Sequence, residues 1–313
     1  MLAYIARRLL ATIPVMAMVA VVVFAILRLT PGDPAAIIAG DSATAEQLAQ
    51  MRVHMGLDKP IYVQFFVWMM QLARGDLGLS LISGVPVAGI IGDRIGPTVA
   101  LGTSIIVFSV IVAIPLGVVA AWRQGSLLDR AIMAFSVFGF SVPVFVIGYV
   151  LILVFANQLG WLPVQGYRPL ADGLWPFLQR LILPTLALST AYIALLARIT
   201  RTSILEVMGE DFIRTARAKG LTETVVLRRH ALANAAVPIV TIIGVGVAAL
   251  ISGVVVTESV FNLPGLGRLV VEAVLARDYP VIQGLILFFS FIYIMINLVI
   301  DVIYTVFDPR IRY

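Results

Sequence analysis

The sequence has no cysteine, and charged residues make up only 12% of its 313 positions. The absence of cysteine excludes structural disulfides and any metal or redox chemistry that depends on thiols. A soluble domain carries charge on about a quarter of its residues. The shortage of charge therefore argues against a soluble protein and points to one that lies in a membrane.

The chain also lacks the residues of a usual nucleotide-hydrolysing site. A P-loop places Ser or Thr after Gly-Lys to hold phosphate and magnesium, whereas neither of the two lysines, Lys59 and Lys219, follows a glycine. The two histidines, His54 and His230, fall on opposite sides of the membrane in the topology given below, which excludes a shared zinc site. No apolar run places a base beside a serine nucleophile. We expect no enzymatic activity, metal or cofactor on this chain.

Long apolar runs account for most of the sequence. Hydrophobic residues make up 61% of it, and the mean hydropathy is +1.04. A helix needs roughly 20 residues to cross the hydrocarbon core of a bilayer. Six uncharged runs approach or exceed that length, and they predict an all-α membrane protein with six spans: residues 9–27, 95–122, 131–167, 181–197, 231–257 and 279–300.

Three of these runs need comment. The first lacks a convincing cleavage site and is longer than the apolar part of a secretory signal, so we interpret it as a retained helix. The third is too long for one span and should leave the membrane near Asn157, before the turn-like residues 160–163. The fourth is short and should extend past Arg180 or Arg198.

The distribution of basic residues predicts the orientation. With both termini in the cytoplasm, thirteen of the 22 lysines and arginines fall on the cytoplasmic side, in the shorter segments, as the positive-inside rule expects. These are Arg7, Arg8, Arg123, Arg130, Arg198, Arg201, Arg214, Arg217, Lys219, Arg228, Arg229, Arg310 and Arg312. The basic pI of about 9.7 then reflects topology and contact with anionic lipid, and it requires no nucleic acid.

A large external loop is expected over residues 31–94, with short helices of its own. Thr44 and Gln47 have capping-box spacing before a helix that Gly56 can end, and Pro60 opens a second helix that closes near Gly75. Five apolar residues form a stripe on this second helix, either to pack against the membrane domain or to contact a soluble external partner: Ile61, Phe65, Trp68, Met69 and Leu72. Since no linker or repeat interrupts the chain, residues 1–313 are predicted to form one transmembrane domain.

The loop at residues 198–234 contains a charged segment between two apolar runs. It predicts a short helix, because Glu210 and Asp211 stand at its start, Arg217 and Lys219 near its end, and Gly220 closes it. Glu210 and Arg214 are also spaced for a weak i,i+4 pair. Such a helix in a hydrophilic loop is suited to contact a soluble protein. The alternative is that its cations merely fix the topology, and the basic residues 228–230 are expected to mark the membrane edge.

The fifth run carries the polar residues considered for a substrate pathway or an outer gate. These are Thr241, Ser252, Thr257 and Glu258. An ionisable residue in a span is a functional candidate. The alternative for Glu258 is that it caps the loop that follows the span.

Several motifs, in order along nearly the whole chain, resemble the permeases of the dipeptide, oligopeptide and nickel ABC importers. They are Pro31-Gly-Asp-Pro34, Gly56-Leu-Asp-Lys-Pro60, Gly75-Asp-Leu-Gly-Leu-Ser80, Thr215-Ala-Arg-Ala-Lys-Gly220, Arg229-His-Ala-Leu-Ala-Asn234, Glu258-Ser-Val-Phe-Asn-Leu-Pro-Gly-Leu-Gly267 and Asp308-Pro-Arg310. The resemblance is closest to the first of the two permeases in such systems, including glutathione importers.

The resemblance implies a type I permease bundle with a cytoplasmic coupling helix at Glu210, Asp211, Arg214, Thr215, Ala216, Arg217, Ala218, Lys219 and Gly220. The best-known form of this loop begins Glu-Ala-Ala, whereas this chain, aligned on Gly220, has Arg214-Thr-Ala216. The implied partners are a homologous second permease, two cytoplasmic ATPases that bind ATP and magnesium, and an external binding protein. The chain would then be half of a peptide pathway across a bacterial inner membrane.

Other functions remain open at this point. A nickel or other small-solute importer would share the same motifs. An ion-coupled secondary transporter would need ionisable residues near the middle of the membrane, and the cores of the second, third and fifth runs contain none.

The topology is directly testable with reporter fusions. We expect fusions after Tyr313 and within residues 123–130 to report a cytoplasmic location, and fusions near Gln47 and Gly166 to report an external one, because the basic residues favour this orientation. An external C-terminus would contradict the six-span prediction.

Overall fold

The computed structural model describes residues 2–29, 35–36, 44–54 and 56–307. Throughout these ranges the chain forms helices and loops, with a single isolated bridge between Leu79 and Pro86 and no strand. The first and last of the motifs quoted above, at residues 31–34 and 308–310, lie outside the described residues. The all-α prediction is confirmed.

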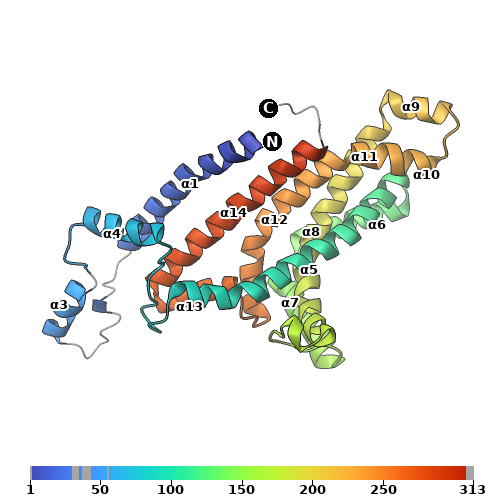
Figure 1. Ribbon diagram of the computed structural model, residues 1–313. Coiled ribbons are helices and arrows are strands. Elements are labelled where there is room, and N and C mark those ends of the chain that lie inside the picture. The colour runs from blue at the N-terminus through green and yellow to red at the C-terminus, as the bar shows by residue number, and fades with distance from the viewer. Residues whose placement is uncertain (1, 30–34, 37–43, 55, 308–313) are drawn as a thin grey trace. The chain divides into compact units, whose positions relative to one another are not determined.

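Among the described residues, five helices are long and apolar enough to cross a membrane (Figure 1). They are α1 (Leu2–Leu29), α5 (Val87–Trp122), α8 (Leu174–Met208), α12 (Ala236–Val260) and α14 (Tyr279–Phe307). A sixth span is formed if the bent pair of α6 (Leu127–Ser141) and α7 (Val144–Leu151) is counted as one; the π-helical turn Ile152–Gln158 continues α7. α8 runs past both Arg180 and Arg198, as expected for the fourth run.

The third apolar run is not one continuous helix. Its two helices meet at an angle of 101°, and Val142 between them is extended, with ψ of 124°. The cause is Pro143, because a proline disfavours the helical conformation of the residue before it and cannot donate a backbone hydrogen bond. The helical part then ends at Gln158, next to the exit predicted near Asn157.

The chain divides into two compact units, each described by itself. The N-terminal unit comprises Met1–Gly96 and Arg268–Ile294, and the central unit comprises Pro97–Gly267 and Met295–Tyr313. The prediction of one domain for residues 1–313 stays a prediction.

The N-terminal unit contains the two helices expected in the large loop, α3 (Ala45–His54) and α4 (Ile61–Ala73). The predicted capping box is present: the Thr44 N–H donates to Gln47 Oε1 at 2.9 Å, and the Gln47 N–H donates to Thr44 Oγ1 at 3.3 Å. On α4, Phe65 and Trp68 pack against Phe24 of α1, with ring centroids 5.2 and 5.6 Å away. This contact supports a packing role for the apolar stripe, although Ile61 at its start is exposed.

Two carboxylates of this unit bind residues that are far away in the sequence. Ser80 Oγ donates to Asp278 Oδ2 at 2.5 Å, and the Leu81 N–H donates to Asp278 Oδ1 at 3.1 Å. Arg94 contacts Glu272 of α13 (Leu266–Ala276) at 3.6 Å. These contacts fasten the end of the long loop to the turn that precedes α14.

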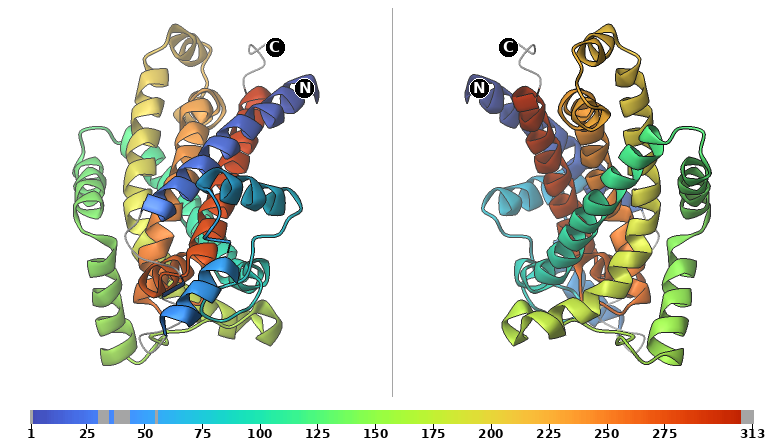
Figure 2. Two further views of the ribbon diagram at one scale, coloured as in Figure 1. Left: turned by 90° about the vertical axis from the view of Figure 1, so that its left-hand side faces the viewer. Right: turned by 90° about the vertical axis from the view of Figure 1, so that its right-hand side faces the viewer.

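The central unit is built on α8, which packs against α5, α6, α7 and α12; Figure 2 shows α8 and α12 side by side. Small residues allow close approach of these helices. A Cβ on Gly117 of α5 would lie 2.5 Å from Thr200 Cβ on α8, and a Cβ on Gly246 of α12 would lie 2.0 Å from the Tyr192 ring. Tyr192 also donates a hydrogen bond to the Ile243 carbonyl at 2.8 Å. The glycines therefore set the spacing of this bundle.

Candidate coupling site

The charged segment forms the predicted short helix, α9 (Asp211–Ala218), which lies beyond the end of α8 in Figures 1 and 2. Glu210 is extended at its start, Asp211 stands in the first turn and Arg217 in the last, which is the distribution that the helix dipole favours. The start and end of the helix agree with the sequence prediction.

Gly220 ends α9 in the way that its position suggested. Its φ is +80°, a conformation in which a residue with a Cβ is strained. The Gly220 N–H donates to the Arg217 carbonyl at 2.9 Å and the Leu221 N–H donates to the Ala216 carbonyl at 3.4 Å. Together these bonds form a Schellman motif, which satisfies carbonyls at the end of the helix.

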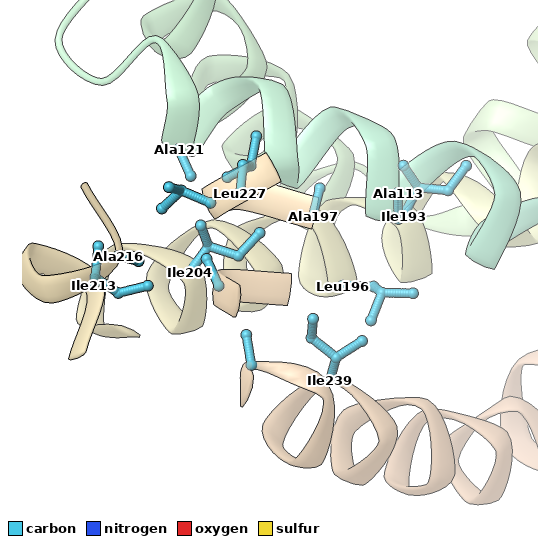
Figure 3. Packing of buried hydrophobic residues seen from close by; sticks show 13 residues of the cluster. Ala113, Ala121, Ile193, Leu196, Ala197, Ile204, Ile213, Ala216, Leu227 and Ile239 are labelled. Atoms are coloured by element: carbon cyan, nitrogen blue, oxygen red, sulfur yellow. The ribbon is translucent and has the colours of Figure 1, made fainter. Parts of the chain in front are cut away.

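One face of α9 is buried. Ile213 is 0% exposed and Ala216 is 6% exposed, and both belong to a hydrophobic cluster that includes Ile204 of α8, Ala121 of α5 and Leu227 (Figure 3). Leu227 lies in a second π-helical turn, Val226–Ala231, which follows the single turn α10 (Glu223–Val225) and leads through α11 (Leu232–Asn234) into α12. α9 is thus anchored to the ends of several long helices at once.

The opposite face of α9 is exposed and charged. Arg214 pairs with Asp211 at 3.2 Å, not with Glu210 as the spacing predicted, because Glu210 is extended and lies outside the helix. The exposed side chains of the predicted site on this helix and its end are those of Asp211, Arg214, Thr215, Arg217, Ala218 and Lys219, and Phe212 is exposed among them. Such a surface presents an apolar ring surrounded by charges of both signs.

A salt bridge joins the end of α9 to α10. The Arg217 guanidinium donates to both oxygens of the Glu223 carboxylate, at 2.7 and 3.2 Å. This hydrogen bonding raises the pKa of Arg217 from its ordinary value. Arg217 therefore stabilises the conformation of the loop between α9 and α10. Arg228 and Arg229 are exposed on the following turn, whose apolar residues are buried.

The four polar residues of the fifth span are spread along α12, and their place in a substrate pathway stays a prediction. Thr241 and Thr257 donate to carbonyls four residues earlier in α12, at 2.8 and 3.0 Å, and Ser252 is exposed. Thr241 and Glu258 are 17 residues apart, which on a helix is about 25 Å. No shared binding site joins these residues within α12.

Glu258 is fully buried at the end of α12. Thr98 Oγ1 donates to its Oε1 at 2.6 Å and accepts the Leu266 N–H at 2.8 Å. A Cβ on Gly265 would lie 2.0 Å from Glu258 Oε1, so the loop after α12 closes over the carboxylate only because glycine stands there. This geometry favours the alternative of a residue that holds the loop, and a role for Glu258 in an outer gate stays a prediction.

Sequence reasoning missed Thr98 and Ile213, whereas Ala216, the other buried anchor of α9, was among the predicted residues. Thr98 lies 160 positions from Glu258, and no periodicity links them. Ile213 could have been found, because it and Ala216 are three residues apart and share one face of the helix. Within the described residues no three His, Asp or Glu side chains are grouped to hold a metal ion.

An open groove of about 600 Å³ lies between α5 and α8 of the central unit. Its walls are apolar, with Val107, Ile111 and Leu181 among them. Ser104 Oγ and Thr185 Oγ1 lie 2.7 Å apart in the groove and share a hydrogen bond. The groove therefore presents hydrophobic surface and no charged group.

Comparison with known proteins gives consistent results along the whole chain. Residues 113–313 match the family described as binding-protein-dependent transport system inner membrane component, and residues 1–102 match the N-terminal model of such membrane components. A probable peptide ABC transporter permease protein, y4tP of Sinorhizobium fredii, is 53% identical over 310 residues, covering 99% of each chain. The glutathione transport system permease protein GsiC of Escherichia coli K12 is 46% identical over 313 residues, covering 100% of each.

A solved structure shares the fold. A chain of the MetNI methionine ABC transporter, in an inward-facing conformation, aligns with a TM-score of 0.59 at 18% identity, covering 70% of this chain and 96% of that one. The predicted type I permease bundle is thereby supported at the level of fold.

The buried face of α9 can be separated experimentally from its exposed face. Ile213→Ala should loosen α9, since removing such a buried side chain costs about 2–5 kcal/mol, and amide hydrogen exchange of residues 211–220 should accelerate. Phe212→Ala is the matched control on the exposed face and should leave exchange unchanged. Equal protection in the Ile213→Ala variant would show that the cluster does not anchor α9.

Proposed function

Because the chain belongs to the family of binding-protein-dependent transport system inner membrane components, we propose that it is the peptide-importing permease that its relatives are named for, and that α9 couples it to ATP hydrolysis. It forms half of the translocation pathway, and a homologous second permease forms the other half. The peptide substrate is inferred from the relatives named as peptide and glutathione permeases, at 53% and 46% identity over essentially the whole chain.

One observation carries the coupling role: α9 is buried on one face and charged on the other. A helix that served only to fix topology would not need Ile213 to be fully buried in the cluster that contains Ile204. With that anchor, a force on the exposed face reaches α8 and the neighbouring helix ends as a rigid displacement. Phe212, Arg214 and Lys219 are positioned to meet the partner.

The partner is a pair of cytoplasmic ATPases, which bind ATP and magnesium. The chain itself is a transport subunit without a P-loop, so the energy of hydrolysis must arrive through a protein contact. An external binding protein delivers the substrate. Closure of the ATPases on ATP then moves α9 and opens the pathway outward, and hydrolysis resets it.

The orientation follows from this role. α9 and both chain termini are cytoplasmic, and residues 31–94 are external. The positions of Ala121 and Ile213 in one cluster support this topology, because they bring the end of α5 and the coupling loop to the same end of the central unit. The arginines of both segments then lie on the cytoplasmic side, as the positive-inside rule requires.

An ion-coupled transporter that works alone is the rival function. It needs titratable side chains that face an aqueous path near mid-membrane. Glu258 is the acidic residue of α12, and it is fully buried near the helix end, bonded to Thr98. A nickel or other small-solute importer would differ only in its cargo.

Gly220 tests the coupling role. Gly220→Val should reduce peptide uptake about tenfold or more with normal membrane insertion, because a β-branched residue is strained at φ of +80° and the Schellman end of α9 is lost. Uptake of labelled di- and tripeptides is measured together with copurification of the ATPases. Gly220→Asn is the control and should retain most of the uptake, since asparagine tolerates this conformation. Normal uptake by Gly220→Val would refute the proposed role of α9.

A further inference from the structure

A partly buried ion pair joins α6 to α8 close to the coupling site. Arg201 of α8 donates to Asp129 through two nitrogens: Nε lies 2.6 Å from Oδ1 and the NH2 nitrogen lies 2.8 Å from Oδ2. The Asp129 side chain is 4% exposed and the Arg201 side chain 22%. A planar guanidinium held at two points fixes the direction as well as the distance between its partners.

Asp129 also organises the turn between α5 and α6. Its Oδ2 accepts the Gly125 N–H at 2.9 Å, and its own N–H donates to Ser126 Oγ, the cap of α6, at 3.3 Å. Gly125 has a φ of +78°, which the tight turn requires. A single carboxylate thus holds the end of the turn, the start of α6 and the side chain of Arg201 together.

Arg201 lies on α8 between the crossing with α5 and the cluster that anchors α9. Its neighbour Thr200 touches the close crossing of α5 at Gly117, and Ile204, one turn further, lies in the cluster that anchors α9. α6 contributes no residue to that cluster. α6 packs along α8, and the bidentate ion pair adds a polar contact between α6 and the end of α8 that carries α9.

We propose that the Asp129–Arg201 ion pair is a positioning element that makes α6 move together with α8 when the coupling helix is displaced. The proposal rests on the coupling role of α9 proposed above. It extends that role because α6 leads into α7, which contacts the other end of α12. There Gly148 of α7 packs against Phe261, and a Cβ on Gly148 would lie 3.2 Å from the Phe261 ring. Motion transmitted to α6 thereby reaches the opposite end of the bundle.

The test uses the complete importer, with the second permease, the ATPases and the binding protein, purified in lipid nanodiscs. The natural absence of cysteine allows spin labels to be placed at Ala134→Cys on α6 and Thr202→Cys on α8, both exposed positions. The distance distribution between the labels is compared without nucleotide and with Mg-ATP trapped by vanadate. Binding-protein stimulation of Mg-ATP hydrolysis is measured on the same samples.

With the ion pair intact, the distribution should keep the same width in both states. In Asp129→Asn and in Arg201→Gln it should broaden in the trapped state, and the stimulation of hydrolysis should fall about fivefold or more. Arg201→Lys keeps the charge without the planar fork and should give an intermediate result. Asp172→Asn breaks the exposed Arg168–Asp172 pair, 3.4 Å long, and should behave as wild type.

Two failures are distinguishable. If the wild-type chain does not copurify with the ATPases and the binding protein does not stimulate Mg-ATP hydrolysis, the coupling function itself is refuted. If hydrolysis by the wild-type complex is stimulated but Asp129→Asn and Arg201→Gln keep its distance distribution and its stimulation, the positioning role of the pair is overturned. All values are normalised to the amount of purified complex. If a neutral variant does not assemble, Arg201→Lys is compared with wild type instead, and a wild-type distance distribution and stimulation in this variant would overturn the positioning role.

Discussion

The burial of Ile213 and Ala216 beneath α9 is the contact on which the functional account depends. A charged helix of eight residues has little stability of its own, so its orientation comes from the cluster that it shares with α5, α8 and the turn after α10. The Schellman end at Gly220 and the Arg217–Glu223 bridge complete the constraint. A rigid, exposed helix results, fixed to helices that are long enough to cross a bilayer.

Two buried carboxylates of the central unit have partners close to the ends of the apolar helices. Asp129 meets Arg201 at the start of α6, and Glu258 meets Thr98 at the end of α12. In lipid, an ionised or hydrogen-bonding group without a partner is costly, so each of these residues both requires and fixes its neighbour. The same constraint that disfavours charge in the middle of the spans is met here because both carboxylates lie where helices meet loops.

Much of this structure was predictable, because it depends on local signals. The apolar runs gave the long helices, the Thr44–Gln47 spacing gave the start of α3, and Gly220 gave the end of α9. A proline such as Pro143 permits a kink, but the size of the bend, 101°, was not predicted, since the apolar run continues on both sides of it. The partners of Glu258 and Asp129, Thr98 and Arg201, were also missed. These contacts join residues far apart in sequence, and a single sequence carries no visible signal for them.

The central claim is that the exposed face of α9 contacts an ATPase. The most direct measurement places one cysteine at Phe212→Cys in this otherwise cysteine-free chain and tests photocrosslinking to the copurified ATPase with and without Mg-ATP, with Ser252→Cys on α12 as the control position. The account predicts an ATPase adduct from position 212 whose yield changes with nucleotide, and none from position 252. An absence of ATPase adducts from position 212 in an assembled, active complex would contradict it.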